Sequence, residues 1–177
     1  YRLQPPQSEK RFALRMKGST DDWQTHHELH DQCWYPVKLD AGDIFQGTPY
    51  FNLYKGEPEI KAMSAMNYDA CTIGNHDFDA GMENLAAQLT QHANFPMLVA
   101  NYDFSGTPME YKTQPYKIFK KGKLKIGVFG VSIEGRGLIP DNLFGATKYL
   151  DPVQKANETA DQLKRSESCD MVICLSH

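Results

Sequence analysis

The sequence lacks an apolar run long enough to cross a membrane. Its longest apolar stretch, residues 126–133, contains two glycines and falls far short of the roughly 20 residues that a membrane-spanning helix needs. An excess of positive charge is lacking too, because 19 basic and 22 acidic side chains give a net charge of −3. Binding to a nucleic-acid backbone requires a basic surface, so we expect neither a membrane span nor a nucleic-acid partner.

Closely spaced cysteine pairs are also missing. Cys33, Cys71, Cys169 and Cys174 show no C-x-x-C spacing, so we interpret them as buried apolar thiols in or beside strands rather than as a zinc or disulfide framework. No signal-peptide pattern opens the chain, which starts at Tyr1 and stops at His177 directly after an apolar run. We therefore expect a fragment, and its compartment does not follow from these residues.

From Val37 onward, short apolar runs alternate with helical patterns, which predicts an α/β fold of mostly parallel strands with covering helices. We predict strands at 37–40, 69–73, 96–100 and 171–175, and a hairpin formed by 116–120 and 124–132. Residues 42–56 are expected to form a loop. Residues 1–36 show no sustained period, so we expect a divergent or irregular N-terminal segment (1–36) before a partial catalytic domain (37–177).

Helices are predicted at 59–68, at 81–92 and after Asp151. The second follows the i, i+3, i+4, i+7 template. For the third, Asp151 is the expected N-cap and Pro152 the first helical residue. Its buried stripe is predicted to comprise Val153, Ala156, Ala160 and Leu163.

Polar side chains follow the predicted strands at the point where each strand ends. Loops at the carboxyl ends of parallel strands converge, so these side chains should gather at one edge of the sheet. They are Asp43 after the first strand, Asn75, His76, Asp77 and Asp79 after the second, Asn101 after the third, and His177 after the last.

Taken alone, Asp43 is better explained as a turn or helix-cap residue, although a carboxylate there can also bridge two cations. The group Gly74-Asn75-His76-Asp77-Phe78-Asp79 favours the second interpretation. The amide oxygen of Asn75 is a neutral hard ligand for a dication. In an extended backbone His76 points away from Asn75, so its imidazole can donate a proton while Asp79 orients the ring.

These motifs resemble the calcineurin-like metallophosphoesterase superfamily, whose members carry G-D and G-N-H-[DE] after successive strands. Residues 42–49 (Gly-Asp-Ile-Phe-Gln-Gly-Thr-Pro), residues 74–79, Ala100-Asn101 and the closing Leu175-Ser176-His177 are similar to the catalytic domain of the 5′-nucleotidase family. The resemblance covers residues 37–177 and implies a layered αββα sandwich, present here in part. A protein Ser/Thr phosphatase would show a different motif at residues 42–47.

The resemblance implies a hydrolase with two divalent ions, of Zn, Mn, Co, Mg or Ca, that removes phosphate from a small phosphoester such as a nucleotide. By carry-over, Asp43 would bridge the ions, Asn75 and His177 would bind the second, and His76 with Asp79 would be catalytic. Asn101 would lie beside the substrate. The resemblance also implies that a C-terminal domain, absent here, selects the nucleoside. It further implies a periplasmic, cell-envelope or extracellular location.

The sequence departs from the family in its metal ligands. The Asp-x-His pair that opens the family's domain is absent, and the downstream His-rich segment is not reached, so only one of the two ions is partly supported. Asp21, Asp22, His26, His27 and His30 have suitable chemistry but the wrong spacing. Two alternatives therefore stay open: another branch of the superfamily, such as a 2′,3′-cyclic-nucleotide phosphodiesterase or a sulfosugar-releasing hydrolase, and a catalytically dead binding or scaffold fragment.

Overall fold

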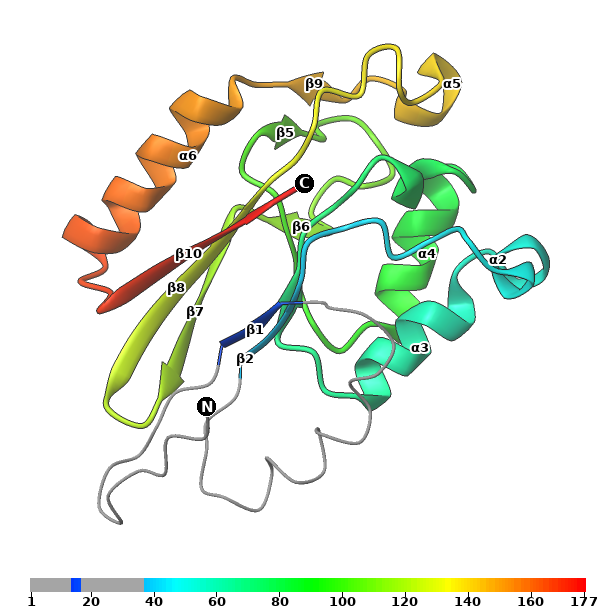
Figure 1. Cartoon of the computed structure of the whole chain (residues 1–177). Coiled ribbons are helices and arrows are strands. Elements are labelled where there is room, and N and C mark those ends of the chain that lie inside the picture. Colours follow the sequence, from blue (N-terminus) through cyan, green and yellow to red (C-terminus); the bar gives the residue numbers. More distant parts are fainter. Residues whose placement is uncertain (1–13, 17–36) are drawn as a thin grey trace, which may run out of the picture.

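The computed structural model describes residues 14–16 and 37–177, which form two facing sheets with helices on both outer sides (Figure 1). Within these residues the first sheet has five strands in the order β1-β2-β3-β4-β6, all paired in parallel. They are β1 (Leu14–Met16), β2 (Val37–Asp40), β3 (Ala70–Cys71), β4 (Met97–Leu98) and β6 (Thr113–Gln114).

The second sheet has the order β10-β8-β7. Its strands are β7 (Tyr116–Lys121), β8 (Leu124–Val131) and β10 (Met171–Ser176). β8 pairs in parallel with β10 and antiparallel with β7, so the hairpin that we predicted is confirmed. A small antiparallel pair, β5 (Tyr102–Asp103) and β9 (Lys148–Tyr149), lies outside both sheets.

The helices divide between the two sheets. α2 (Pro49–Tyr54), α3 (Glu57–Ala65) and α4 (Met82–His92) lie beside the first sheet, on the right of Figure 1. α6 (Pro152–Asp161) continues through the π-helical turn η3 (Gln162–Ser166) and covers the second sheet on the left. The short α5 (Asp141–Phe144) precedes β9.

Three apolar clusters fill the spaces between these layers. Ile60, Leu85 and Met97 belong to the cluster between the first sheet and its helices. Val37, Leu98, Ile126 and Leu175 belong to a cluster between the two sheets. Phe129 and Leu163 belong to the third, between the second sheet and α6. The order is helix, sheet, sheet, helix, so the αββα architecture with mostly parallel strands is confirmed.

The structure contains two α-helices that we did not predict, α2 and the short α5. Residues 49–54 were expected to lie in a loop, but they form α2, in which Thr48 accepts a hydrogen bond from the Phe51 backbone N–H (3.2 Å) and Pro49 opens the first turn. α2 has one buried side chain, Phe51, so it shows no apolar period. The helix expected at 59–68 runs from Glu57 to Ala65, and the strands expected at 69–73 and 96–100 are two residues long.

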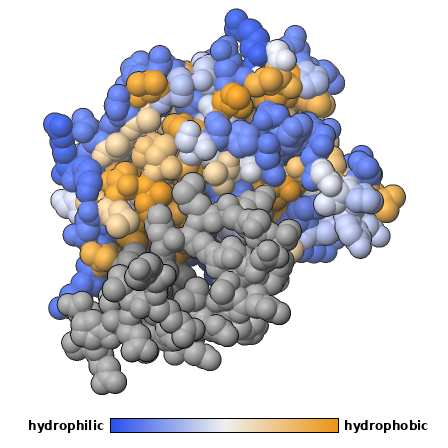
Figure 2. Space-filling view, viewed as in Figure 1, coloured by the Kyte–Doolittle hydropathy of each residue, from blue (hydrophilic) through white to orange (hydrophobic). Residues whose placement is uncertain are grey.

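Two predictions of burial are wrong. Val153 lies in the first turn of α6 and is 69% exposed, whereas Thr159 is buried. Cys174 is exposed because it lies on the face of β10 opposite the buried Ile173 and Leu175, and Figure 2 shows an apolar surface along this strand. Cys71 and Cys169 are buried free thiols, as predicted.

The N-terminal segment is described only at Leu14–Met16. These residues form β1, which pairs in parallel with β2. The division of the chain at residue 36 stays a prediction. The other residues singled out in this segment, Cys33 and the acidic and histidine residues between 21 and 30, lie outside the described residues. None of the helices in the described part is long and apolar enough to span a membrane.

Candidate metal and catalytic site

The loops after β2 and β3 meet at two glycines. A Cβ on Gly42 would lie 2.7 Å from the backbone N of Gly74, and a Cβ on Gly74 would lie 2.2 Å from Oδ1 of Asp43. Asp43 itself has a left-handed backbone, with φ of 56°. The two loops can therefore touch only where side chains are missing, which explains why a glycine accompanies each ligand motif.

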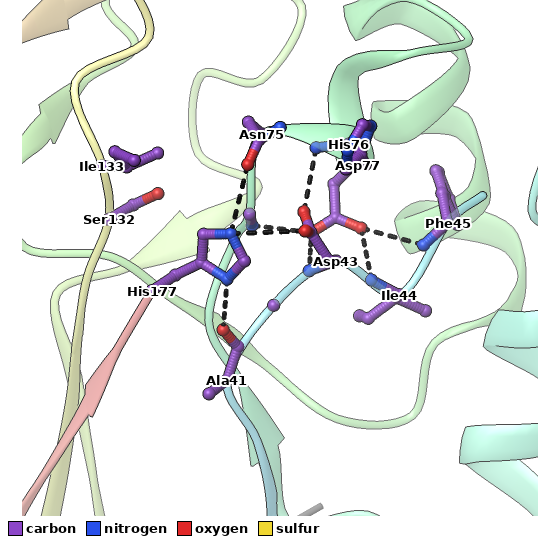
Figure 3. A network of polar contacts seen from close by, with 12 residues as sticks. Ala41, Asp43, Ile44, Phe45, Asn75, His76, Asp77, Ser132, Ile133 and His177 are labelled. Atoms are coloured by element: carbon purple, nitrogen blue, oxygen red, sulfur yellow. Dashed lines mark hydrogen bonds and ion pairs between the residues drawn. The ribbon is translucent and has the colours of Figure 1, made fainter. Parts of the chain in front are cut away.

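Asp77 joins these loops through a fully buried carboxylate (Figure 3). Its Oδ1 accepts hydrogen bonds from the backbone N–H groups of Ile44 (2.8 Å) and Phe45 (3.1 Å). Its Oδ2 accepts from those of Gly74 (2.7 Å) and Asp43 (3.2 Å). Burial raises the pKa of Asp77 to about 6, although these backbone hydrogen bonds oppose the shift. We predicted no role for Asp77, because a sequence does not show which backbone groups a carboxylate will meet.

Asp43 and Asn75, from the loops after β2 and β3, converge with His177 at the end of β10 (Figure 3). Nε2 of His177 lies 3.2 Å from Oδ1 of Asn75 and 3.4 Å from Oδ2 of Asp43. Nδ1 of His177 lies 2.8 Å from the carbonyl oxygen of Ala41, which can only accept, so Nδ1 carries the proton. Nε2, the second ring nitrogen, faces these two oxygen atoms and is the ligand atom that His177 would offer to a cation.

This donor set fits a divalent cation. A carboxylate, an amide oxygen and an imidazole are ordinary ligands of Mn²⁺, Zn²⁺ and related ions. Within residues 14–16 and 37–177, however, no group of three or more His, Cys, Asp and Glu side chains is arranged to hold a metal. The cluster therefore offers at most part of the coordination that one ion would need, and the described residues offer no second set.

His76 and Asp79 form a pair beside this cluster. Nδ1 of His76 lies 2.9 Å from Oδ2 of Asp79, and the backbone N–H of His76 donates to Oδ1 of Asp43 (2.9 Å). With an extended backbone His76 would point away from Asn75, but the chain instead forms the 3₁₀ turn η2 (His76–Phe78). The hydrogen bond to Asp79 raises the pKa of His76 above its usual value, against desolvation. The His76 side chain is 44% exposed and therefore accessible to a substrate.

Asn101 lies in a different environment. Its side chain is fully buried, its Nδ2 donates to the carbonyl oxygen of Ser132 (2.8 Å), and its Oδ1 accepts from the backbone N–H of Ser132 (2.8 Å). Tyr102 adds a hydrogen bond from its hydroxyl group to Oγ of Ser132 (3.1 Å). These contacts hold the segment after β8 beside Asn75 and His177, where Figure 3 shows Ser132 and Ile133. The role of Asn101 beside a substrate stays a prediction.

Comparisons with known proteins agree with this geometry. No model of a known protein family matches the chain. A 5′-nucleotidase of Vibrio cholerae is 38% identical over 141 residues, which are 78% of this chain and 25% of that protein. The crystal structure of a 5′-nucleotidase precursor from Thermus thermophilus has a TM-score of 0.76 and 29% identity over 86% of this chain and 30% of that one.

A calcineurin-like phosphoesterase from Bacillus subtilis is also similar in structure, with a TM-score of 0.67 and 30% identity over 87% of this chain and 51% of that one. The chain spans about a quarter of the length of the 5′-nucleotidases that it matches in sequence. Sequence and fold therefore agree that the chain belongs to the 5′-nucleotidase family of calcineurin-like metallophosphoesterases.

Proposed function

We propose that this chain forms part of a metal-dependent phosphoester hydrolase that removes the phosphate group from nucleotides. One observation carries the proposal: Asp43, Asn75 and His177 direct three ligand atoms toward one another, and the His76–Asp79 pair lies directly beside them. The similarity to proteins named 5′-nucleotidase supports a nucleotide as the substrate.

The chain's own residues would act in two ways. Asp43, Asn75 and His177 would hold a cation, which when bound supplies an acidified water molecule and positive charge against the phosphate oxygens. His76 would hold its Nδ1 proton toward Asp79 and present Nε2 to the substrate. A doubly protonated His76 could then give the Nε2 proton to the oxygen of the departing group, with Asp79 stabilising the charged ring.

The finer points of the proposal follow from the family. The family uses two divalent ions, and the described residues would supply part of the coordination of one of them. We propose that Asp43 bridges the two ions. We propose further that residues 37–177 are part of a catalytic domain preceded by a distinct segment 1–36, and that nucleoside selection depends on a second, C-terminal domain.

The test is to remove metal by dialysis against a chelator and then measure hydrolysis of p-nitrophenyl phosphate and AMP with added Mn²⁺, Co²⁺ or Zn²⁺. Activity should return with metal and fall at least about a hundredfold in Asn75→Ala and His76→Ala. Asn157→Ala and His92→Ala, on α6 and at the end of α4, are the matched controls and should retain activity. Binding of Mn²⁺ without any turnover would instead favour the inactive binding fragment.

A further inference from the structure

Gln46 has a backbone conformation that its side chain does not favour. Its φ is 79°, in the left-handed region where glycine is the usual residue. The residues before it hold it there, because the N–H groups of Ile44 and Phe45 donate to the buried carboxylate of Asp77. The Phe45 ring is also fixed, since it occupies the space that a Cβ on Gly56 would need. A strained residue held in place beside a candidate site points to a use for its side chain.

The side chain of Gln46 reaches across to the second loop. Its Nε2 donates a hydrogen bond to Oδ2 of Asp79, the same oxygen that lies 2.9 Å from Nδ1 of His76. The amide nitrogen is a donor only, so this oxygen acts as an acceptor toward Gln46. The loop after β2 therefore contacts the loop after β3 at two carboxylates. Its backbone donates hydrogen bonds to Asp77, and its Gln46 side chain donates one to Asp79.

We infer that Gln46 is a positioning residue, which fixes the carboxylate of Asp79 so that His76 keeps its proton on Nδ1 and its ring in one orientation. This inference rests on the proposed function, because it assigns Gln46 a role through the pair that would transfer the proton. Without Gln46, the Asp79 carboxylate is free to rotate about its last side-chain bond, which has only a broad preference. His76 would then lose a fixed partner.

The decisive variant is Gln46→Gly, because it removes the side chain and relieves the backbone strain together. If Gln46 has only a structural role, this change should leave the site intact and stabilise the protein. If Gln46 positions Asp79, the variant should be at least as stable as the wild type. Its kcat, measured with Mn²⁺ and AMP, should be about tenfold lower with a nearly unchanged KM. Gln46→Met, which keeps the length without the donor, should lower kcat in the same way.

A second measurement needs neither metal nor turnover. Nitrogen NMR on metal-free protein with isotopically labelled histidine, at one fixed pH, reports which ring nitrogen of His76 carries the proton, with His76→Asn to assign the signals. The wild type should show a single Nδ1-protonated form, and both Gln46 variants a mixture of the two tautomers. The matched control is Lys55→Gly, since Lys55 is also left-handed (φ 55°) and exposed but lies at the end of α2. It should change neither the NMR signals nor kcat.

Unchanged His76 signals in both Gln46 variants would overturn the inference, whatever the activity of the wild type. An unchanged kcat in an active protein would overturn it as well. If the wild type hydrolyses no phosphoester while its His76 signals still respond to Gln46, the proposed function fails and the positioning contact stands.

Discussion

At the scale of single residues, the candidate site depends on the fully buried carboxylate of Asp77. Oδ1 of Asp77 accepts hydrogen bonds from the backbone N–H groups of Ile44 and Phe45. Oδ2 accepts them from those of Gly74 and Asp43. In Asp77→Asn, an NH₂ group would face one of these pairs of donors. A buried donor without an acceptor destabilises a protein by about 1–3 kcal/mol, and two N–H groups lose their partner as well.

We therefore expect Asp77→Asn to lower the free energy of unfolding by at least about 2 kcal/mol, as measured by urea denaturation. It should also weaken Mn²⁺ binding, because the loop that presents Asp43 loses its support. Asp161→Asn, at an exposed ion pair with Arg165 on α6, is the control and should have little effect. A stable Asp77→Asn protein with normal Mn²⁺ affinity would show that the backbone contacts alone hold the two loops together.

A second residue-scale prediction concerns the contact between the glycines. A Cβ on Gly74 would lie 2.4 Å from the backbone N of Asp43, so Gly74→Ala must push the two loops apart. We expect a loss of about 1–3 kcal/mol in the free energy of unfolding together with loss of Mn²⁺ binding. Gly106→Ala is the control for backbone strain without contact, because Gly106 has a positive φ (74°), which Gly74 does not, and has open space around it. It should cost about 1 kcal/mol and leave Mn²⁺ binding unchanged.

At the scale of elements, caps can be read from the sequence and tested separately from the site. Oδ1 of Asp151 accepts the backbone N–H of Gln154 (2.8 Å), as expected for the N-cap of α6. Asp151→Ala should lower the free energy of unfolding by about 1 kcal/mol, and Asp151→Ser should restore most of it. Both variants should bind Mn²⁺ normally, because α6 packs behind the second sheet. Equal stability of the two variants would mean that the cap contributes nothing.

The same scale shows what could be predicted from the sequence. α4 and α6 were predicted from their apolar period, which the Asp151 cap supports in α6. β2 and the β7–β8 hairpin were predicted from short apolar runs. α2 was missed because it buries only Phe51. The convergence of Asp43, Asn75 and His177 follows from the rule for parallel strands, whereas the contacts of Asp77 and Gln46 depend on loop conformations with positive φ that no local pattern reveals.

At the scale of the whole molecule, the site joins the two sheets. Asp43 and Asn75 follow strands of the first sheet, while His177 follows β10 of the second. The geometry of the three proposed ligands therefore depends on how closely the sheets approach each other. Gly130 of β8 marks that approach, because a Cβ there would lie 2.0 Å from the carbonyl oxygen of Leu98 and 2.3 Å from Oγ1 of Thr72.

We expect Gly130→Ala to weaken Mn²⁺ binding at least about tenfold in calorimetric titration, although none of the three proposed ligands is changed. The reason is that the clash is with backbone and must separate the sheets. Gly127→Ala is the matched control on the same strand. Its Cβ would meet the Leu163 side chain at 2.8 Å, on the face covered by α6, and a side chain can move aside. It should lower stability with little effect on Mn²⁺ affinity. Equal effects of the two variants on affinity would mean that the spacing between the sheets does not control the site.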